Sequence, residues 1–130
     1  MHAIIIEPDA ILGRTYGAAL QAHGWTATCV PHGQAAIEAV DAQFPDVLIM
    51  EIQLPGINGL GFLQEFRSYH DLSEVTIIIN TFTKPQEILQ IKELMRRDFA
   101  IAAWLDKTQT SLERFVATVS EHSAKTKAES

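Results

Sequence analysis

The sequence lacks several features that mark common classes of protein. It has one cysteine, Cys29, and therefore no internal disulfide. The apolar alternation of "WTATCV" around it predicts a small buried side chain. No apolar run approaches the roughly 20 residues that a membrane span requires, so we expect no membrane segment. The opening "MHAIIIEPD" reaches an acid too early for a signal peptide, and a cytoplasmic location is the default expectation.

Basic clusters and metal-ligand spacings are also scarce. The formal net charge of −6 argues against direct nucleic-acid binding, because phosphates require clustered lysine and arginine. The small basic group of Lys92, Arg96 and Arg97 is interpreted as a solvated helix face or a protein contact. The five histidines lack the spacing of a zinc site, and no serine, histidine and aspartate form a hydrolase motif. We therefore do not expect an enzyme.

Five short apolar runs alternate with helical patterns along the chain. The runs have the length and β-branched content of strands and cover residues 3–6, 25–30, 46–50, 75–80 and 101–106. Helix boundary signals agree with this division: Asp9 and Thr110 or Ser111 as caps, and Pro85 at a helix start. Successive βα units predict an α/β, doubly wound domain with a parallel sheet. We expect this domain over residues 1–123, with 124–130 as a frayed tail or the start of a linker.

Chemically active side chains follow four of the predicted strands. They are Glu7 and Asp9 after the first strand, Glu51 after the third, Thr81 after the fourth and Lys107 after the fifth. In an open parallel sheet, ligands bind beyond the carboxyl ends of the strands. The sequence therefore predicts that acids, a hydroxyl and an ammonium group converge at one edge of the sheet.

The order and spacing of these residues resemble a known family. Glu51 follows Glu7 by 44 residues, Thr81 follows after 30 more, and Lys107 after another 26. The loop "LPGING" follows the third strand, and Trp104 stands three residues before Lys107. In this combination the chain resembles a receiver domain of the bacterial response regulators, over residues 3–122. The resemblance implies a flavodoxin-like (βα)5 fold, the strand order 2-1-3-4-5, a role in two-component phosphorelay signalling, and Trp104 as an aromatic switch residue.

The resemblance also implies a chemistry from which this sequence departs. In the family, an aspartate after the third strand accepts a phosphoryl group from a histidine kinase, assisted by Mg²⁺ and a lysine, and a threonine hydroxyl then holds the phosphoryl oxygen. Glu51 occupies the acceptor position here. Its extra methylene displaces the carboxylate, and a displacement of about 1 Å can cost roughly 100-fold in rate. Slow or absent phosphorylation is the expectation.

Two further departures concern the metal and the pocket rim. Pro8 replaces the second acid after the first strand, and we expect no metal cofactor; if Mg²⁺ binds, Glu7, Asp9 and Glu51 are the weak candidates. Asp9 has a competing interpretation as a helix cap. Phe82 stands where the family has a small residue, which predicts a partly filled pocket.

These departures favour a degenerate receiver, or pseudo-receiver, that signals through protein contacts. Glu51 then either imitates a phosphorylated aspartate or only pairs with Lys107 as a structural charge. The expected partners are a histidine kinase, an output domain or a regulatory target. A homodimer could form through the fourth helix, fifth strand and fifth helix, with the candidate residues Ile88, Ile91, Lys92, Met95, Arg96, Trp104 and Phe115. Two alternatives stay open: a working phosphoacceptor, and a flavodoxin-like module that binds a small molecule.

Overall fold

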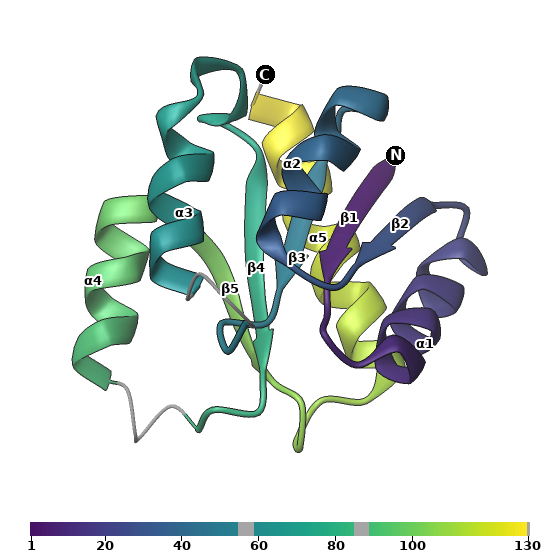
Figure 1. Cartoon of the computed structure of the whole chain (residues 1–130). Helices are drawn as coiled ribbons and strands as arrows, with labels where there is room; N and C mark the ends of the chain where they lie inside the picture. Colours follow the sequence, from purple (N-terminus) through teal and green to yellow (C-terminus); the bar gives the residue numbers. More distant parts are fainter. Residues whose placement is uncertain (55–58, 85–88, 130) are drawn as a thin grey trace.

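The computed structural model describes residues 1–54, 59–84 and 89–129, and the side chains as far as Ser123. It contains a five-stranded parallel sheet with the order β2-β1-β3-β4-β5, which confirms the predicted fold class and strand order (Figure 1). The strands are β1 (His2–Ile6), β2 (Thr26–Val30), β3 (Val47–Met50), β4 (Thr76–Thr81) and β5 (Ile101–Asp106). The helices are α1 (Ala10–Gln21), α2 (Gly33–Ala42), α3 (Gly59–Ser68), the short 3-10 helix η1 (His70–Leu72), α4 (Leu89–Phe99) and α5 (Leu112–Glu129).

The central strands are buried on both faces because helices cover the sheet from either side. Along β1, Ile4 and Ile6 pack with α2, α3 and α4, whereas Ala3 and Ile5 pack with α1 and α5. Figure 1 shows the same division into two helical layers. A strand that faces apolar helices on both sides must be apolar at successive positions, which explains runs such as "AIII". No helix in the described parts of the chain is long and apolar enough to cross a membrane.

Local signals place the helix starts. The Asp9 carboxylate accepts hydrogen bonds from the backbone N–H groups of Ile11 and Leu12 at 2.9 and 3.1 Å and caps α1. The Ser111 hydroxyl accepts the N–H of Arg114 at 3.1 Å at the start of α5. Side-chain oxygens at these positions satisfy donors that the helix itself leaves free. The predicted helix start at Pro85 lies outside the described residues, as does most of the loop "LPGING".

Two expectations differ from the structure. Cys29 is exposed, because β2 is an edge strand with a neighbour on only one side. Although the residue as a whole is exposed, its thiol lies against α1 and donates to the carbonyl of Gly13; this partial burial, together with the charge of Glu7, raises the pKa of the thiol and argues against a reactive thiolate. The backbone of α5 continues to Glu129, into the stretch 124–130 that was expected as a frayed tail or the start of a linker, while the domain boundary at residue 123 stays a prediction. The alanine, lysine and glutamate content of this stretch favours a helix.

Candidate functional site

The carboxyl ends of β1, β3, β4 and β5 bring the predicted residues together. Glu51 directly follows β3, and its backbone N–H donates to the carbonyl of Ile6 at 3.1 Å, next to Glu7. Lys107 follows β5, and its N–H donates to the carbonyl of Thr81 at 2.9 Å. These bonds continue the parallel ladders one residue past the strands. They hold the backbone at Glu7, Glu51, Thr81 and Lys107 so that these four side chains start close together at one edge of the sheet.

Lys107 lies between two carboxylates. Its Nζ forms ion pairs with Oε1 of Glu7 and, at 2.9 Å, with Oε1 of Glu51. Only 1% of the lysine side chain and 5% of each glutamate side chain are exposed. A buried charge needs a partner, and here one ammonium group serves two acids. We call Glu7, Glu51, Thr81 and Lys107 the acid–lysine cluster.

Both oxygens of Glu51 accept hydrogen bonds from the protein itself. Oε1 accepts from Lys107 and from the backbone N–H of Phe82, the latter at 3.3 Å. Oε2 accepts from the Thr81 hydroxyl and from the backbone N–H of Gln53, the latter at 3.1 Å. Each acceptor atom of the carboxylate thus has two donors that belong to the protein.

The pKa values of the central pair move in the directions that keep both groups charged. Burial raises the pKa of Glu51, but hydrogen bonds from Thr81, Gln53 and Lys107 outweigh it, and the pKa is lowered. Burial lowers the pKa of Lys107, but its contacts with Glu7 and Glu51 outweigh it, and the pKa is raised. Near neutral pH the pair is therefore a stable ion pair.

Phe82 covers this pair from outside. The side chain is 51% exposed, and Lys107 Nζ lies 4.7 Å from the centre of the ring, within the range of a cation–π contact. The ring therefore covers the lysine ammonium and is itself about half exposed. Beneath it, Thr81 has no exposed surface.

Two residues of the site carried no signal in the sequence analysis. The Gln53 side-chain amide donates to the hydroxyl of Thr83 at 2.8 Å, and the Thr83 N–H donates to the hydroxyl of Thr81 at 3.1 Å. Gln53 stands two residues after Glu51, and Thr83 stands two residues after Thr81. At this spacing a side-chain oxygen often accepts a hydrogen bond from the backbone N–H two residues later, and this spacing is the signal by which the sequence could have indicated both residues. The two residues link the ends of β3 and β4.

Trp104 is partly buried and packs against the core under α2, α3 and α4. Lys92 Nζ on α4 lies 5.8 Å from the centre of the ring. The buried indole N–H has no hydrogen-bond partner in the described residues. The tryptophan therefore joins β5 to α4, on the face that the resemblance associates with partner contacts.

The Mg²⁺ ion implied by the resemblance does not fit the residues present. Glu7 and Glu51 both face the Lys107 ammonium, which supplies the positive charge between them. Pro8 offers no side-chain oxygen, and the carboxylate of Asp9 caps α1. Magnesium requires several oxygen ligands in near-octahedral geometry. Within the described residues, no three histidine, cysteine, aspartate or glutamate side chains are placed to hold a metal ion.

The fold and the acid–lysine cluster together define a receiver-type domain. The family model described as the response regulator receiver domain matches residues 3–100, and the chain belongs to this family. This result confirms the predicted family at the level of the receiver domain.

Comparison with individual proteins agrees. The probable transcriptional regulatory protein TcrX of Mycobacterium tuberculosis is 32% identical over 65 residues, which cover 50% of this chain and 28% of TcrX. The chain spans between 16% and 32% of the length of the curated relatives that it matches. A sensor protein from Polaromonas sp. JS666 is similar in structure, with a TM-score of 0.85 at 16% identity over 96% of this chain and 97% of that one. A CheY-like receiver domain from Methanospirillum hungatei JF-1 gives 0.84 at 13% identity over 99% and 98%.

Proposed function

We propose that this domain is a pseudo-receiver, which signals through protein contacts without accepting a phosphoryl group and catalyses no reaction. The observation that carries the proposal is the state of the Glu51 carboxylate. Its two oxygens accept hydrogen bonds from Thr81, Lys107 and the backbone N–H groups of Phe82 and Gln53. A nucleophilic oxygen would have to leave some of these donors before it could attack phosphorus.

The charges support the same proposal. An incoming phosphate ester is an anion, and a carboxylate attacks it only when nearby cations neutralise the developing charge. Lys107 already pairs with both Glu7 and Glu51, so the cluster keeps one more negative than positive charge. Phe82 covers the lysine on its outer side. The net negative charge of the cluster therefore repels an anionic phosphoryl donor, and the ring of Phe82 hinders its approach to Lys107.

The same contacts support a fixed signalling state. In the family, a threonine hydroxyl and a lysine hold the phosphoryl oxygens after transfer, as the resemblance implies. Here the Glu51 carboxylate accepts hydrogen bonds from the same two groups, the hydroxyl of Thr81 and the ammonium of Lys107. We propose that Glu51 holds Thr81 inward and keeps the domain in one conformation. Glu51 carries one negative charge, whereas a phosphoryl group carries about two. We therefore expect Glu51 to hold Thr81 inward less strongly than a phosphoryl group would.

The proposed partner surface is the face of α4, β5 and α5. Three large apolar side chains on α4 are exposed, Leu89 at 59%, Ile91 at 47% and Leu94 at 47%. Met95 and Phe115, two earlier candidates for this face, are buried in the core, and Ile88 lies outside the described residues. Because TcrX is a probable transcriptional regulatory protein and much longer than the matched segment, an output domain or a regulatory target is the proposed partner class, with a histidine kinase or a second copy as further candidates.

The test is intact-mass spectrometry after incubation with acetyl phosphate and Mg²⁺. The native chain, Glu51→Asp and Glu51→Asp/Phe82→Ala are treated in parallel, and a family member with an aspartate acceptor shows that the reagent is active. No mass gain on the native chain is expected, with a gain on the double variant and a smaller one or none on Glu51→Asp. A phosphoryl group on the native chain, removed by acid or hydroxylamine, would overturn the proposal.

A working phosphoacceptor is the second candidate, because Thr81 and Lys107 are retained beside an acid at the acceptor position. The same experiment separates it from the pseudo-receiver. Binding of a small molecule at this edge has less support. Thr81 has no exposed surface and the Lys107 side chain 1%, so the pair offers a ligand no open cavity.

A further inference from the structure

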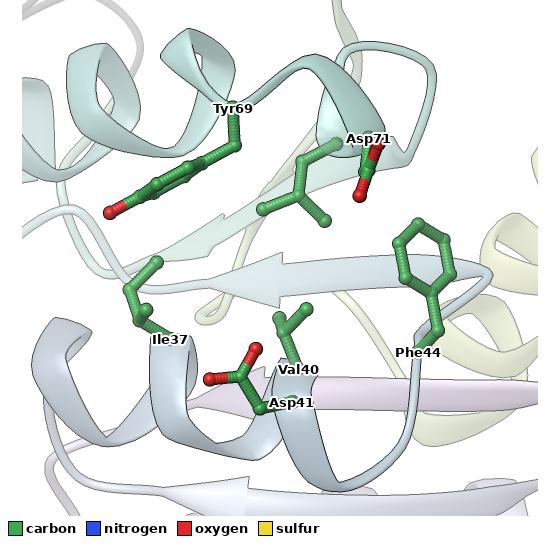
Figure 2. Close-up of a pocket in the computed structure, with 7 residues that line it drawn as sticks. Ile37, Val40, Asp41, Phe44, Tyr69 and Asp71 are labelled. Carbon is green, nitrogen blue, oxygen red and sulfur yellow. The ribbon is translucent and has the colours of Figure 1, made fainter.

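A second feature lies at the opposite edge of the sheet, where α2 and α3 end. A groove of about 410 Å³ separates α2 from the end of α3 and from η1 (Figure 2). Its apolar wall consists of Ile37, Val40, Phe44, Tyr69 and Leu72. We call it the α2–α3 groove. The loops that form it precede β3 and β4, whereas the acid–lysine cluster follows the strands (Figure 1).

The groove exposes two aromatic rings over an apolar floor. Phe44 is 53% exposed and Tyr69 is 45% exposed, while Leu72, which also lines the groove, is 4% exposed. Isolated apolar side chains on a surface are ordinary, but aromatic rings grouped around a hollow are typical of contact surfaces. Half-exposed aromatic rings of this kind supply much of the energy of protein interfaces.

Two carboxylates face the groove from opposite walls. Figure 2 shows Asp41 on α2 and Asp71 on η1, with Val40 labelled between them. Within the described residues, neither carboxylate has a hydrogen bond or an ion pair, in contrast to Glu7 and Glu51. A cation placed in the groove would meet both.

The carboxyl end of α2 adds negative potential at the same place. The carboxyl end of a helix carries a partial negative charge, which a lysine or arginine in the last turn often offsets. The last turn of α2 has no basic residue. The last turn of α3 has Arg67, whose guanidinium donates to the carbonyls of Phe99, Leu72 and Ser73 at 3.0, 2.8 and 3.0 Å and whose charge offsets the end of that helix. Residues 15–66, which include all of α2, contain no lysine or arginine.

We propose that the α2–α3 groove docks a basic, apolar segment of a protein partner. An arginine or lysine of that segment lies between Asp41 and Asp71, and an adjoining apolar side chain packs between Phe44 and Tyr69. The negative potential opposes an anionic membrane or a nucleic acid at this face, so charge complementarity selects a cationic protein segment. The inference does not depend on the state of Glu51, because the groove lies at the other edge of the sheet.

The experiment maps the binding of a defined probe on the folded chain. Amide chemical shifts of the ¹⁵N-labelled protein are followed while a short amphipathic peptide of leucine and arginine is added. Shifts centred on Val40, Phe44, Tyr69 and Leu72 are expected, with much weaker effects from the same peptide carrying glutamate in place of arginine. The variant Asp41→Asn/Asp71→Asn is expected to weaken binding about tenfold.

A matched control separates the groove from net charge. The variant Glu113→Gln/Glu121→Gln removes two exposed acids from α5 and is expected to bind the arginine peptide within twofold of the native chain. If the aspartate variant loses the dispersion of its spectrum, Phe44→Ser, at an exposed position, replaces it. The proposal fails if the shifts centre elsewhere, if both double variants lose affinity equally, if the glutamate peptide binds as well, or if vesicles with phosphatidylserine bind through the same residues.

Discussion

The two edges of the sheet use carboxylates in opposite ways. At the carboxyl edge, Glu7 and Glu51 are 5% exposed and share one lysine. At the amino edge, Asp41 and Asp71 are exposed beside an open groove, without an ion pair in the described part of the chain. The first pair is satisfied by the protein, and the second is satisfied only by water or by something that binds.

This difference indicates where the domain can respond to other molecules. A receiver that works by phosphorylation needs an acid with free oxygens and an open approach at the carboxyl edge. The acid–lysine cluster has neither, because Thr81, Lys107 and Phe82 already engage or cover its oxygens. On the proposed function, the surfaces left for recognition are faces built from helices: the exposed side of α4 and the α2–α3 groove.

The largest expected effect comes from removing the shared cation. The substitution Lys107→Met leaves two buried carboxylates without a cation, and breaking a buried ion pair in this way costs about 3–5 kcal/mol. Urea denaturation near neutral pH measures the loss. The control Lys84→Met, at an exposed position, is expected to stay within about 0.5 kcal/mol of the native chain. A loss below about 1 kcal/mol for Lys107→Met would show that the cluster is not satisfied internally.

The second prediction concerns Arg67, which lies near the α2–α3 groove at the amino edge of the sheet. From α3, its guanidinium donates to the carbonyls of Leu72 and Ser73 at the end of η1 and of Phe99 at the end of α4, so this arginine has a structural role. We expect Arg67→Ala to cost about 2 kcal/mol, because buried carbonyls lose charged donors. Thermal or urea unfolding measures this, with Arg114→Ala on the exposed side of α5 as the matched control. Equal stability of the two variants would mean that the three hydrogen bonds of Arg67 contribute nothing to the fold.

The contribution of Glu51 to the free energy of unfolding should depend on pH in a way that the contributions of exposed acids do not. Because folding lowers the pKa of Glu51 below its ordinary 4.5, its stabilising contribution is fully present above that value. It is lost as the pH falls through the lowered pKa. The difference in unfolding free energy between the native chain and Glu51→Gln should therefore shrink below pH 4.5, while Glu121→Gln follows the native curve. A difference that grows on acidification would contradict the assigned contacts.

The smallest effect is expected from the groove acids. Replacing both Asp41 and Asp71 by asparagine should change stability by no more than about 0.5 kcal/mol, because exposed groups without partners contribute little. A slight gain is consistent with relief of repulsion at the end of α2. Calorimetry of the variant checks this. A loss above about 1 kcal/mol would mean that these carboxylates support the fold and are not available to a ligand.

The parts of the molecule that depend on periodicity and local signals could be predicted from the sequence. The apolar runs around Ile4 and Ile77 gave buried parallel strands, and the cap at Asp9 formed as expected. The positions of Glu51 and Lys107 at strand ends were enough to predict that their side chains would lie near each other, because parallel strands end at one edge. Neither the sharing of Lys107 between two acids nor the donors on Glu51 follows from spacing.

What could not be predicted depends on side-chain direction and on contacts between distant loops. Phe82 was expected at the rim of a partly filled pocket, but the position of its half-exposed ring over the lysine depends on a rotamer that sequence alone does not determine. Met95 and Phe115 were candidates for the surface, yet both point into the core. The α2–α3 groove joins Phe44 and Tyr69, which are 25 residues apart and belong to no motif.

The most direct test of the central claim asks whether the acid–lysine cluster responds to a phosphoryl mimic. Amide spectra of the native chain are recorded before and after addition of Mg²⁺ with beryllofluoride, which binds a carboxylate oxygen in place of a phosphoryl group. The account predicts unchanged signals for Gln53, Thr81, Phe82 and Lys107, whose groups already engage Glu51. Saturable shifts of these four signals would show that Glu51 is open to a phosphoryl group and would contradict the account.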